Sequence, residues 1–215
     1  MVRVGGTEVD ESDARRWVSE YLDGRKWYGY PYYDKLNTGS DEFSLNDGDL
    51  LAPTLLNAAP SIRSFDGLCQ LRPKLETALR AIPPDLDIIT CSHDDLKLLQ
   101  LLLPVEKPPW GVGGTMVAKV LHRKRPKFIP LYDSRVWHVY AEIGTHPLKR
   151  QGKRSWAEFF EQLGRQMRSD LLENLEFWEA LATSDGRDLS LLRVLDIVVW
   201  SLGRGTDDEE DVAGT

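Results

Sequence analysis

Apolar residues recur with helical spacing along most of this chain, and that periodicity limits its fold more than any other feature. Strand signals, which would be alternating apolar and polar residues, are poor. Two helix starts carry clear capping chemistry: Ser155 is followed by Glu158 as in a capping box, and residues 188–190 open the last apolar helix. The pattern predicts an all-α protein, with helices over 10–22, 47–57, 65–81, 93–103, 115–124, 134–143, 155–182 with a break, and 188–202.

The organisation of the chain indicates a single domain. Its 215 residues contain no internal repeat and no linker rich in Gly, Ser or Pro, and 41% of them are hydrophobic. We expect one domain over 1–205, followed by an acidic, disordered tail over 206–215. No apolar run is long enough to cross a bilayer and no signal peptide is recognisable, so the expected location is cytoplasmic, with no membrane partner.

A glycine turn precedes the helix predicted over 115–124. Gly111 and Gly113, on either side of Val112, let the backbone approach a partner closely. The helix that follows, with Gly114 and Thr115 at its start, opens with exposed amides, and its positive end favours an anion such as a phosphate. A single Gly-x-Gly is also common in ordinary turns between helices.

The same helix has a polar arc. Helical spacing places Thr115, Lys119, His122 and Arg123 on one side, and the long side chain of Lys124 could extend outward near the helix end. This pattern predicts a helix that buries one face and offers a basic face to phosphates. The alternative is an ordinary amphipathic helix with a solvated polar face.

Charge is segregated along the chain. Residues 115–154 contain ten Lys and Arg against two acidic residues, a net charge of +8, whereas the whole chain carries −7. The remainder is therefore −15. Such segregation suits a local site for a polyanion. Basic runs are also often solvated loops, and a pI near 5.2 is unusual for a tight, non-specific DNA binder.

The run GVGGTMVAKVL resembles the hairpin glycines and second helix of the helix-hairpin-helix DNA glycosylases, the superfamily of endonuclease III and the alkyladenine enzymes. In that superfamily a turn that reads roughly LPGVGxxTAxxVL is followed by an apolar segment that ends in the catalytic aspartate. Here Asp133 lies 22 residues after Gly111, behind an apolar approach formed by residues 129–131. The whole chain is also similar to a family of uncharacterised actinobacterial proteins, which brings no activity with it.

The resemblance implies a helix-hairpin-helix glycosylase-like fold with two helical lobes. It also implies a monofunctional DNA glycosylase, which hydrolyses the N-glycosidic bond of a damaged or modified base. Asp133 would stabilise positive charge on the sugar and orient the attacking water. Thr115 stands where bifunctional members carry a Schiff-base lysine, so strand cleavage by β-elimination is not expected. No cofactor is expected, because Cys69 and Cys91 are too few for the iron-sulfur cluster of some members, and no metal site has support.

The resemblance also assigns the partner and its contacts. Duplex DNA would be held at its phosphates by the turn and the start of the following helix, together with the basic side chains of that helix. The implied nucleic-acid-binding residues are Gly111, Val112, Gly113, Gly114, Thr115, Lys119, Arg123 and Lys124.

The segment departs from the superfamily at two places. Pro109 and Trp110 stand where Leu-Pro is usual, and 134–136 read Ser-Arg-Val where Thr-His-Val is common. Asp133 also fits an ordinary helix N-cap, because Asp-Ser directly precedes an apolar-periodic stretch.

A pocket for an extruded base needs aromatic or apolar side chains. The aromatic-rich stretch 27–34 offers Tyr30 and Tyr33, while Trp110 and His138 are candidates by their nearness to the turn and to Asp133. The alternative is that the aromatic stretch anchors a loop on the helical body.

Three functions therefore compete. The first is a DNA-binding helix-hairpin-helix protein with glycosylase activity, and the second is a non-catalytic nucleic-acid-binding module. The third is a helical protein-interaction protein whose basic patch meets an acidic protein partner.

Overall fold

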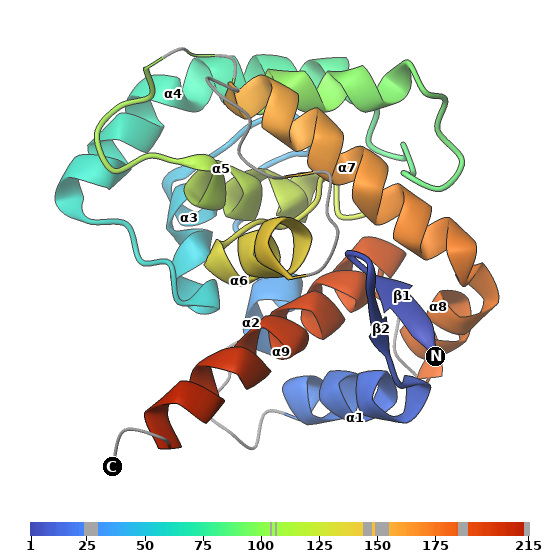
Figure 1. Ribbon diagram of the computed structural model, residues 1–215. Helices are drawn as coiled ribbons and strands as arrows, with labels where there is room; N and C mark the ends of the chain where they lie inside the picture. Colours follow the sequence, from blue (N-terminus) through green and yellow to red (C-terminus); the bar gives the residue numbers. More distant parts are fainter. Residues whose placement is uncertain are drawn as a thin grey trace.

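Helices make up nearly all the regular structure of the protein, as the periodicity predicts (Figure 1). The computed structural model describes residues 1–23, 30–103, 105, 107–143, 148, 155–184 and 189–212. The α-helices are α1 (Glu11–Leu22), α2 (Tyr30–Lys35), α3 (Asp47–Leu51), α4 (Ile62–Ala81), α5 (Gly114–Leu121), α6 (Ser134–Trp137), α7 (Trp156–Glu173), α8 (Leu175–Ala182) and α9 (Leu191–Val212). Shorter helical turns are η1 (Ala52–Leu56), η2 (Asp95–Leu101), η3 (His122–Lys124) and the π-helical η4 (His138–Glu142), and the two strands are β1 (Val2–Val4) and β2 (Thr7–Val9).

The helix starts follow the expected capping chemistry. Asp10 caps α1 by accepting the N–H of Ser12, and Ser155 and Glu158 form the predicted capping box of α7. The break predicted within 155–182 lies at Asn174, between α7 and α8. The all-α class is therefore confirmed, and the capping residues fix where these helices begin.

Four segments differ from the prediction. The stretch 47–57 changes from α3 to the 3₁₀ helix η1, where Pro53 lacks a backbone N–H, and 93–103 forms only η2. The N-terminal hairpin was not predicted, because three-residue strands are too short to show alternation; Gly5 and Gly6, both with positive φ, form its turn. The tail over 206–215, predicted to be disordered, continues α9 as far as Val212, and no proline interrupts it.

The helices pack around one continuous hydrophobic core, which takes residues from Val2 to Val199. In Figure 1, α4 and α7 lie along one side of the molecule, α5 and α6 lie at its centre, and α9 passes beneath them beside α1. Contacts of α9 with α1, α6, α7 and α8 join the two ends of the sequence. The segments with functional predictions, α5 and α6, therefore occupy the middle of the fold.

The N-terminal hairpin is fixed to this body by Asp170 of α7. The carboxylate accepts the N–H of Gly5 at 2.8 Å and the hydroxyl of Tyr140 at 2.7 Å. Burial raises the pKa of Asp170 above its ordinary value, and these hydrogen bonds oppose that rise only in part. One buried side chain thus links the hairpin, η4 and α7.

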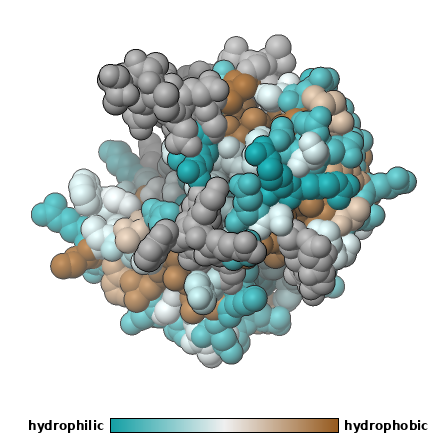
Figure 2. Space-filling view, turned by 90° about the horizontal axis from the view of Figure 1, so that it is seen from below, coloured by the Kyte–Doolittle hydropathy of each residue, from teal (hydrophilic) through white to brown (hydrophobic). Residues whose placement is uncertain are grey.

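The surface seen from below Figure 1 mixes hydrophilic and hydrophobic side chains, and its coloured part shows no continuous apolar face (Figure 2). Within the described part of the chain, no helix combines the length and the hydropathy needed to span a membrane.

Candidate active site at the glycine turn and Asp133

The glycine turn is a type II β-turn. The N–H of Val112 donates to the carbonyl of Pro109 at 3.0 Å, and Gly111 has a φ of +75°. A side chain would be strained in this conformation, and a Cβ on Gly111 would lie 3.2 Å from Cβ of Ser64. Gly111 is exposed, and the turn rests on the start of α4.

The start of α5 lies against an indole ring. Gly113 is the N-cap and provides no side-chain cap, and a Cβ on Gly114 would lie 2.3–2.9 Å from ring atoms of Trp156. Val112 is buried and Thr115 is half-buried. Gly114 is therefore required for packing. Among the turn residues predicted to contact phosphates through their backbone, Gly111 is the most exposed.

Asp133 caps α6 and also lies beside α5. Its Oδ1 accepts the N–H groups of Arg135 and Val136 at 3.0 and 3.1 Å, which confirms the capping interpretation. Its Oδ2 lies 3.4 Å from Nζ of Lys119, and 19% of its side chain is exposed. Backbone hydrogen bonds therefore hold one oxygen, while the other faces a lysine on the helix that the glycine turn opens.

Lys119 is a fixed, buried cation. Only 6% of its side chain is exposed, and Nζ also donates to the carbonyl of Leu56 at 3.0 Å. A carboxylate oxygen of Asp133 and the carbonyl oxygen of Leu56 therefore hold the ammonium group in place.

The prediction of an exposed basic face on this helix is wrong, because its cationic side chains point inward. Nη1 of Arg123 donates to Oδ1 of Asp49 at 3.0 Å, and Nζ of Lys124 donates to Oγ of Ser40 at 2.6 Å and lies 3.6 Å from Oδ2 of Asp49. Their side chains are only 10% and 9% exposed, and His122 is also buried. Arg123 and Lys124 are thus occupied by internal partners, and Lys119 by Asp133 and Leu56.

The buried carboxylate of Asp49 explains this inward arrangement. Burial opposes its ionisation, but hydrogen bonds from Ser40, the N–H of Asn46 and Thr38 lower its pKa below the ordinary value. A fully buried charge must be paired, and the two cations of η3 therefore pair with Asp49. Asp49 lies 74 residues before Arg123, and helical periodicity gives no signal of such a partner.

Other cations lie at the exposed side of the turn. The guanidinium of Arg63 lies 5.5 Å from the ring centroid of Trp110, which is 70% exposed, and Lys107 is exposed three residues earlier. We call Arg63, Lys107, Trp110 and Gly111 the turn surface. Arg63 and Lys107 were not among the predicted contacts, because the first lies on α4 and the second in an irregular stretch.

A cluster of aromatic rings includes Tyr132, the residue directly before Asp133. The ring of Tyr132 lies 4.7 Å from that of Phe159 and 5.7 Å from that of Trp156, and Trp137 lies 5.9 Å from Phe159. Tyr132, Trp137 and Trp156 are half-buried. Trp156 also covers Gly114, so these rings connect the start of α5 with the start of α6. None of these rings was among the predicted pocket residues.

Those predicted pocket residues whose side chains the structure describes do not converge. Trp110 lies on the turn surface, and Nδ1 of His138 lies 2.7 Å from Oε2 of Glu142 on the exposed side of η4. Tyr33 is buried, and its hydroxyl donates to the carbonyl of Lys119 at 2.6 Å. Tyr30 begins α2, but its side chain lies outside the described residues, as do residues 27–29 of the aromatic stretch.

A model of a family of unknown function (DUF6308) matches residues 14–203, which is most of the chain. No curated protein and no solved structure matches it.

Proposed function

The chain belongs to DUF6308, a family of unknown function, and from its own geometry we propose a DNA-binding, helix-hairpin-helix-like protein with monofunctional DNA glycosylase activity. One observation carries the proposal. Oδ2 of Asp133 lies 3.4 Å from Nζ of Lys119, on the helix that the Gly111 turn opens, and this contact supports the proposal.

In this proposal Asp133 acts on the sugar. Its carboxylate stabilises the positive charge that develops as the N-glycosidic bond breaks, and it orients the water whose oxygen bonds to C1′. The base leaves with the bonding electron pair and takes up a proton. The amine of Lys119 is buried and held by Asp133 and the carbonyl of Leu56, so it is not free to attack C1′, and Thr115 has no amine. Hydrolysis without strand cleavage is therefore expected.

The turn surface is the proposed DNA contact. Arg63 and Lys107 supply exposed positive charge for phosphates, and Trp110 offers a ring face for an unpaired base. This contact replaces the one expected at Lys119, Arg123 and Lys124. The half-buried rings beside Asp133 supply apolar surface for an extruded base.

A gel assay tests the chemistry. Wild type is incubated with duplexes that carry alkylated, deaminated, oxidised or mismatched bases, and hot alkali then reveals abasic sites. Asp133→Asn should abolish the alkali-dependent product, since Asn retains capping but not the charge. Asp10→Asn is the matched control, because Asp10 caps α1 in the same way away from the site. Abasic product from Asp133→Asn at the wild-type rate would exclude a catalytic role.

A binding assay tests the contact independently of the chemistry. The double variant Arg63→Ala/Lys107→Ala should weaken duplex binding and reduce the salt dependence of log K by about one to two charges. Lys74→Ala/Lys127→Ala removes two other exposed lysines and serves as the charge-matched control. An equal effect of both double variants would remove the turn surface as the contact.

The capping bonds of Asp133 favour a second function, a nucleic-acid-binding module without catalysis. Salt-sensitive duplex binding with no abasic product on any substrate would establish this function. Absence of binding as well would contradict both nucleic-acid functions and leave an interaction with an acidic protein partner.

A further inference from the structure

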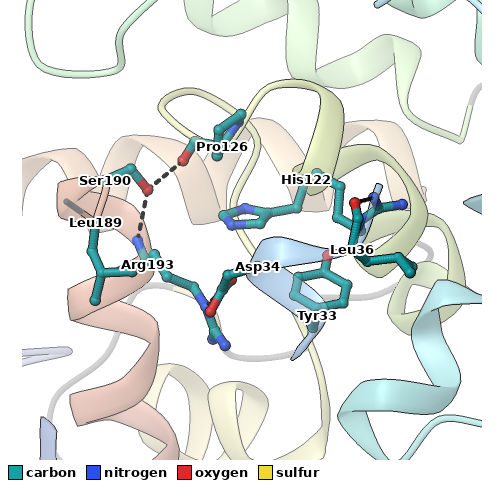
Figure 3. A pocket seen from close by; sticks show the side chains of 9 residues that line it. Tyr33, Asp34, Leu36, His122, Pro126, Leu189, Ser190 and Arg193 are labelled. Atoms are coloured by element: carbon teal, nitrogen blue, oxygen red, sulfur yellow. Dashed lines mark hydrogen bonds and ion pairs between the residues drawn. The ribbon is translucent and has the colours of Figure 1, made fainter. Parts of the chain in front are cut away.

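A second site lies apart from the turn surface and Asp133, at the junction of α2, η3 and the start of α9. It is a pocket of about 200 Å³ between Tyr33, Asp34, His122 and Arg193, with Leu36, Arg123, Pro126, Leu189 and Ser190 completing the walls (Figure 3). Its residues come from three distant parts of the sequence. Only Tyr33 among them was predicted to line a pocket.

Arg193 anchors this pocket through bonds to internal partners. Its Nε donates to Oδ1 of Asp34 at 2.8 Å, its Nη1 to Oδ2 of Asp196 at 2.7 Å, and its Nη2 to the hydroxyl of Tyr21 at 3.2 Å. Each nitrogen therefore has one internal partner, and Nη1 and Nη2 each keep a second N–H. The function of Arg193 is therefore to fix the position of the Asp34 carboxylate.

Two hydrogen-bond acceptors in the pocket remain open. Oδ2 of Asp34 has no partner among the residues that the structure describes. Nδ1 of His122 lies 2.6 Å from the carbonyl of Ile129, so Nδ1 must carry the proton. Burial lowers the pKa of His122 to about 4, and the neutral ring then has an acceptor lone pair on Nε2. Figure 3 shows this imidazole pointing into the pocket, toward Arg193.

The walls favour a flat and uncharged molecule. The rings of Tyr33 and His122 are stacked with centroids 6.3 Å apart, and Leu36 and Leu189 add apolar surface. The guanidinium carbons of Arg123 and Arg193 already lie 6.0 and 5.8 Å from the Tyr33 ring centroid, so two fixed cations oppose a cationic ligand. A cavity of about 150 Å³ can hold benzene, and this pocket is large enough for one substituted six-membered ring.

We propose that this pocket binds a small, neutral heteroaromatic ring that bears an amino group and presents two N–H donors, one to Asp34 and one to His122. The two open acceptors, Oδ2 of Asp34 and Nε2 of His122, select for such a ligand. The site is independent of the proposed glycosylase function, since neither Asp133 nor the turn surface lines the pocket.

Calorimetry with 2-aminopyrimidine as the probe tests the proposal, and pyrimidine, which has the same ring without the N–H donors, is the control ligand. Wild type should bind 2-aminopyrimidine at least about tenfold more tightly than pyrimidine. Asp34→Asn should lose about tenfold in affinity for 2-aminopyrimidine, since the amide keeps an oxygen for Arg193 and turns an N–H toward the probe. Asp66→Asn, exposed on α4, removes the same charge elsewhere and should bind as wild type.

A measurement on wild type covers a failure of Asp34→Asn to fold. The ¹⁵N signal of His122 Nε2 should shift as 2-aminopyrimidine saturates the protein, because its lone pair accepts a hydrogen bond. Three results would overturn the proposal: equal affinity for the two ligands, an unmoved Nε2 signal at saturation, or tighter binding of the cation benzamidine than of 2-aminopyrimidine.

Discussion

Individual charged residues in the middle of this protein have internal partners, and this pairing decides what they can do. Asp49 holds Arg123 and Lys124, while Asp34 and Asp196 hold Arg193. Cations that are committed in this way cannot also neutralise phosphates without leaving a buried carboxylate unpaired, which costs several kcal/mol. The proposed DNA contact therefore rests on exposed residues at the turn.

Two buried residues near the pocket should affect the pH dependence of stability in opposite directions. Burial lowers the pKa of His122 from 6.5 to about 4, so acidification from pH 6.5 to 4 favours the unfolded chain, where the ring is protonated. Burial raises the pKa of Asp196 from 3.8 to about 6, so acidification from pH 6 to 4 favours the folded chain, where the carboxyl is protonated. In wild type the two effects largely cancel.

Single variants should separate the two effects. Between pH 6.5 and 4, Asp196→Asn should lose on the order of 3 kcal/mol more unfolding free energy than wild type, and His122→Gln should lose about that much less. Urea denaturation at a series of pH values measures both. If the pH slopes of the two variants match that of wild type, neither residue titrates as described.

Gly114 shows how a single residue can have a structural role that resembles a functional one. Gly114→Ala would normally stabilise a helix by up to about 1 kcal/mol. Here the added methyl group overlaps the Trp156 ring, so we expect a loss of about 1–3 kcal/mol, measured by urea denaturation. Gly114→Ala/Trp156→Leu, which removes the obstructing ring, should show no further penalty from the alanine relative to Trp156→Leu alone. A stabilising Gly114→Ala would show that the ring moves aside.

The site could be predicted from sequence only in part. The order of glycine turn, helix and Asp133 pointed to the contact of Asp133 with this helix, because Lys119 and Asp133 are only 14 residues apart in the chain. The orientation of the polar arc was wrong, because it depends on Asp49. The pocket at Arg193 was not foreseen, since its members meet only through tertiary packing.

At the scale of elements, the start of α7 depends on local capping chemistry and was predicted, whereas one helix end depends on a distant residue. The C-terminal end of α4 is closed by Arg125, which is fully buried. Its Nε donates to the carbonyl of Ile82 at 2.7 Å, its Nη2 to Leu79 at 2.6 Å, and its Nη1 to Glu42 at 3.0 Å. One planar side chain thus satisfies carbonyls that the helix end leaves open.

Arg125→Met should therefore destabilise the protein by about 3 kcal/mol or more, because it leaves several buried carbonyls without donors. Amide hydrogen exchange should become faster in the last turn of α4, and urea denaturation should show the loss. Arg80→Met removes an exposed arginine from the same helix end and should change stability by less than about 0.5 kcal/mol. Equal effects of the two variants would contradict the closing role of Arg125.

At the scale of the whole molecule, the all-α class followed from periodicity, but the packing of the N-terminal hairpin against the core did not. The hairpin before α1 precedes the family match and has strands of three residues, yet Val2, Val4 and Val9 are buried in the common core. Such short strands carry no usable pattern. Their burial depends on the Asp170 contact, which is 165 residues away from Gly5.

Deletion of residues 2–9 should consequently lower the unfolding free energy by at least about 4 kcal/mol, since three buried valines are lost. Thermal and urea denaturation measure this change. Arg3→Ala/Glu8→Ala, which removes an exposed pair of facing residues from the same strands, should cost less than about 1 kcal/mol. A deletion with wild-type stability would mean that the hairpin does not contribute to the core.

The bonds of Arg193 have a consequence for how the protein is made. Asp34 and Tyr21 lie 159 and 172 residues before Arg193. At about 5–20 residues per second, a ribosome needs roughly ten to thirty seconds to pass from the first partners to the last. During that time the nascent N-terminal quarter has its carboxylate and its aromatic rings but no arginine to join them. The pocket at Arg193 is therefore a property of the finished chain, and any product of premature termination before α9 leaves the ribosome without it.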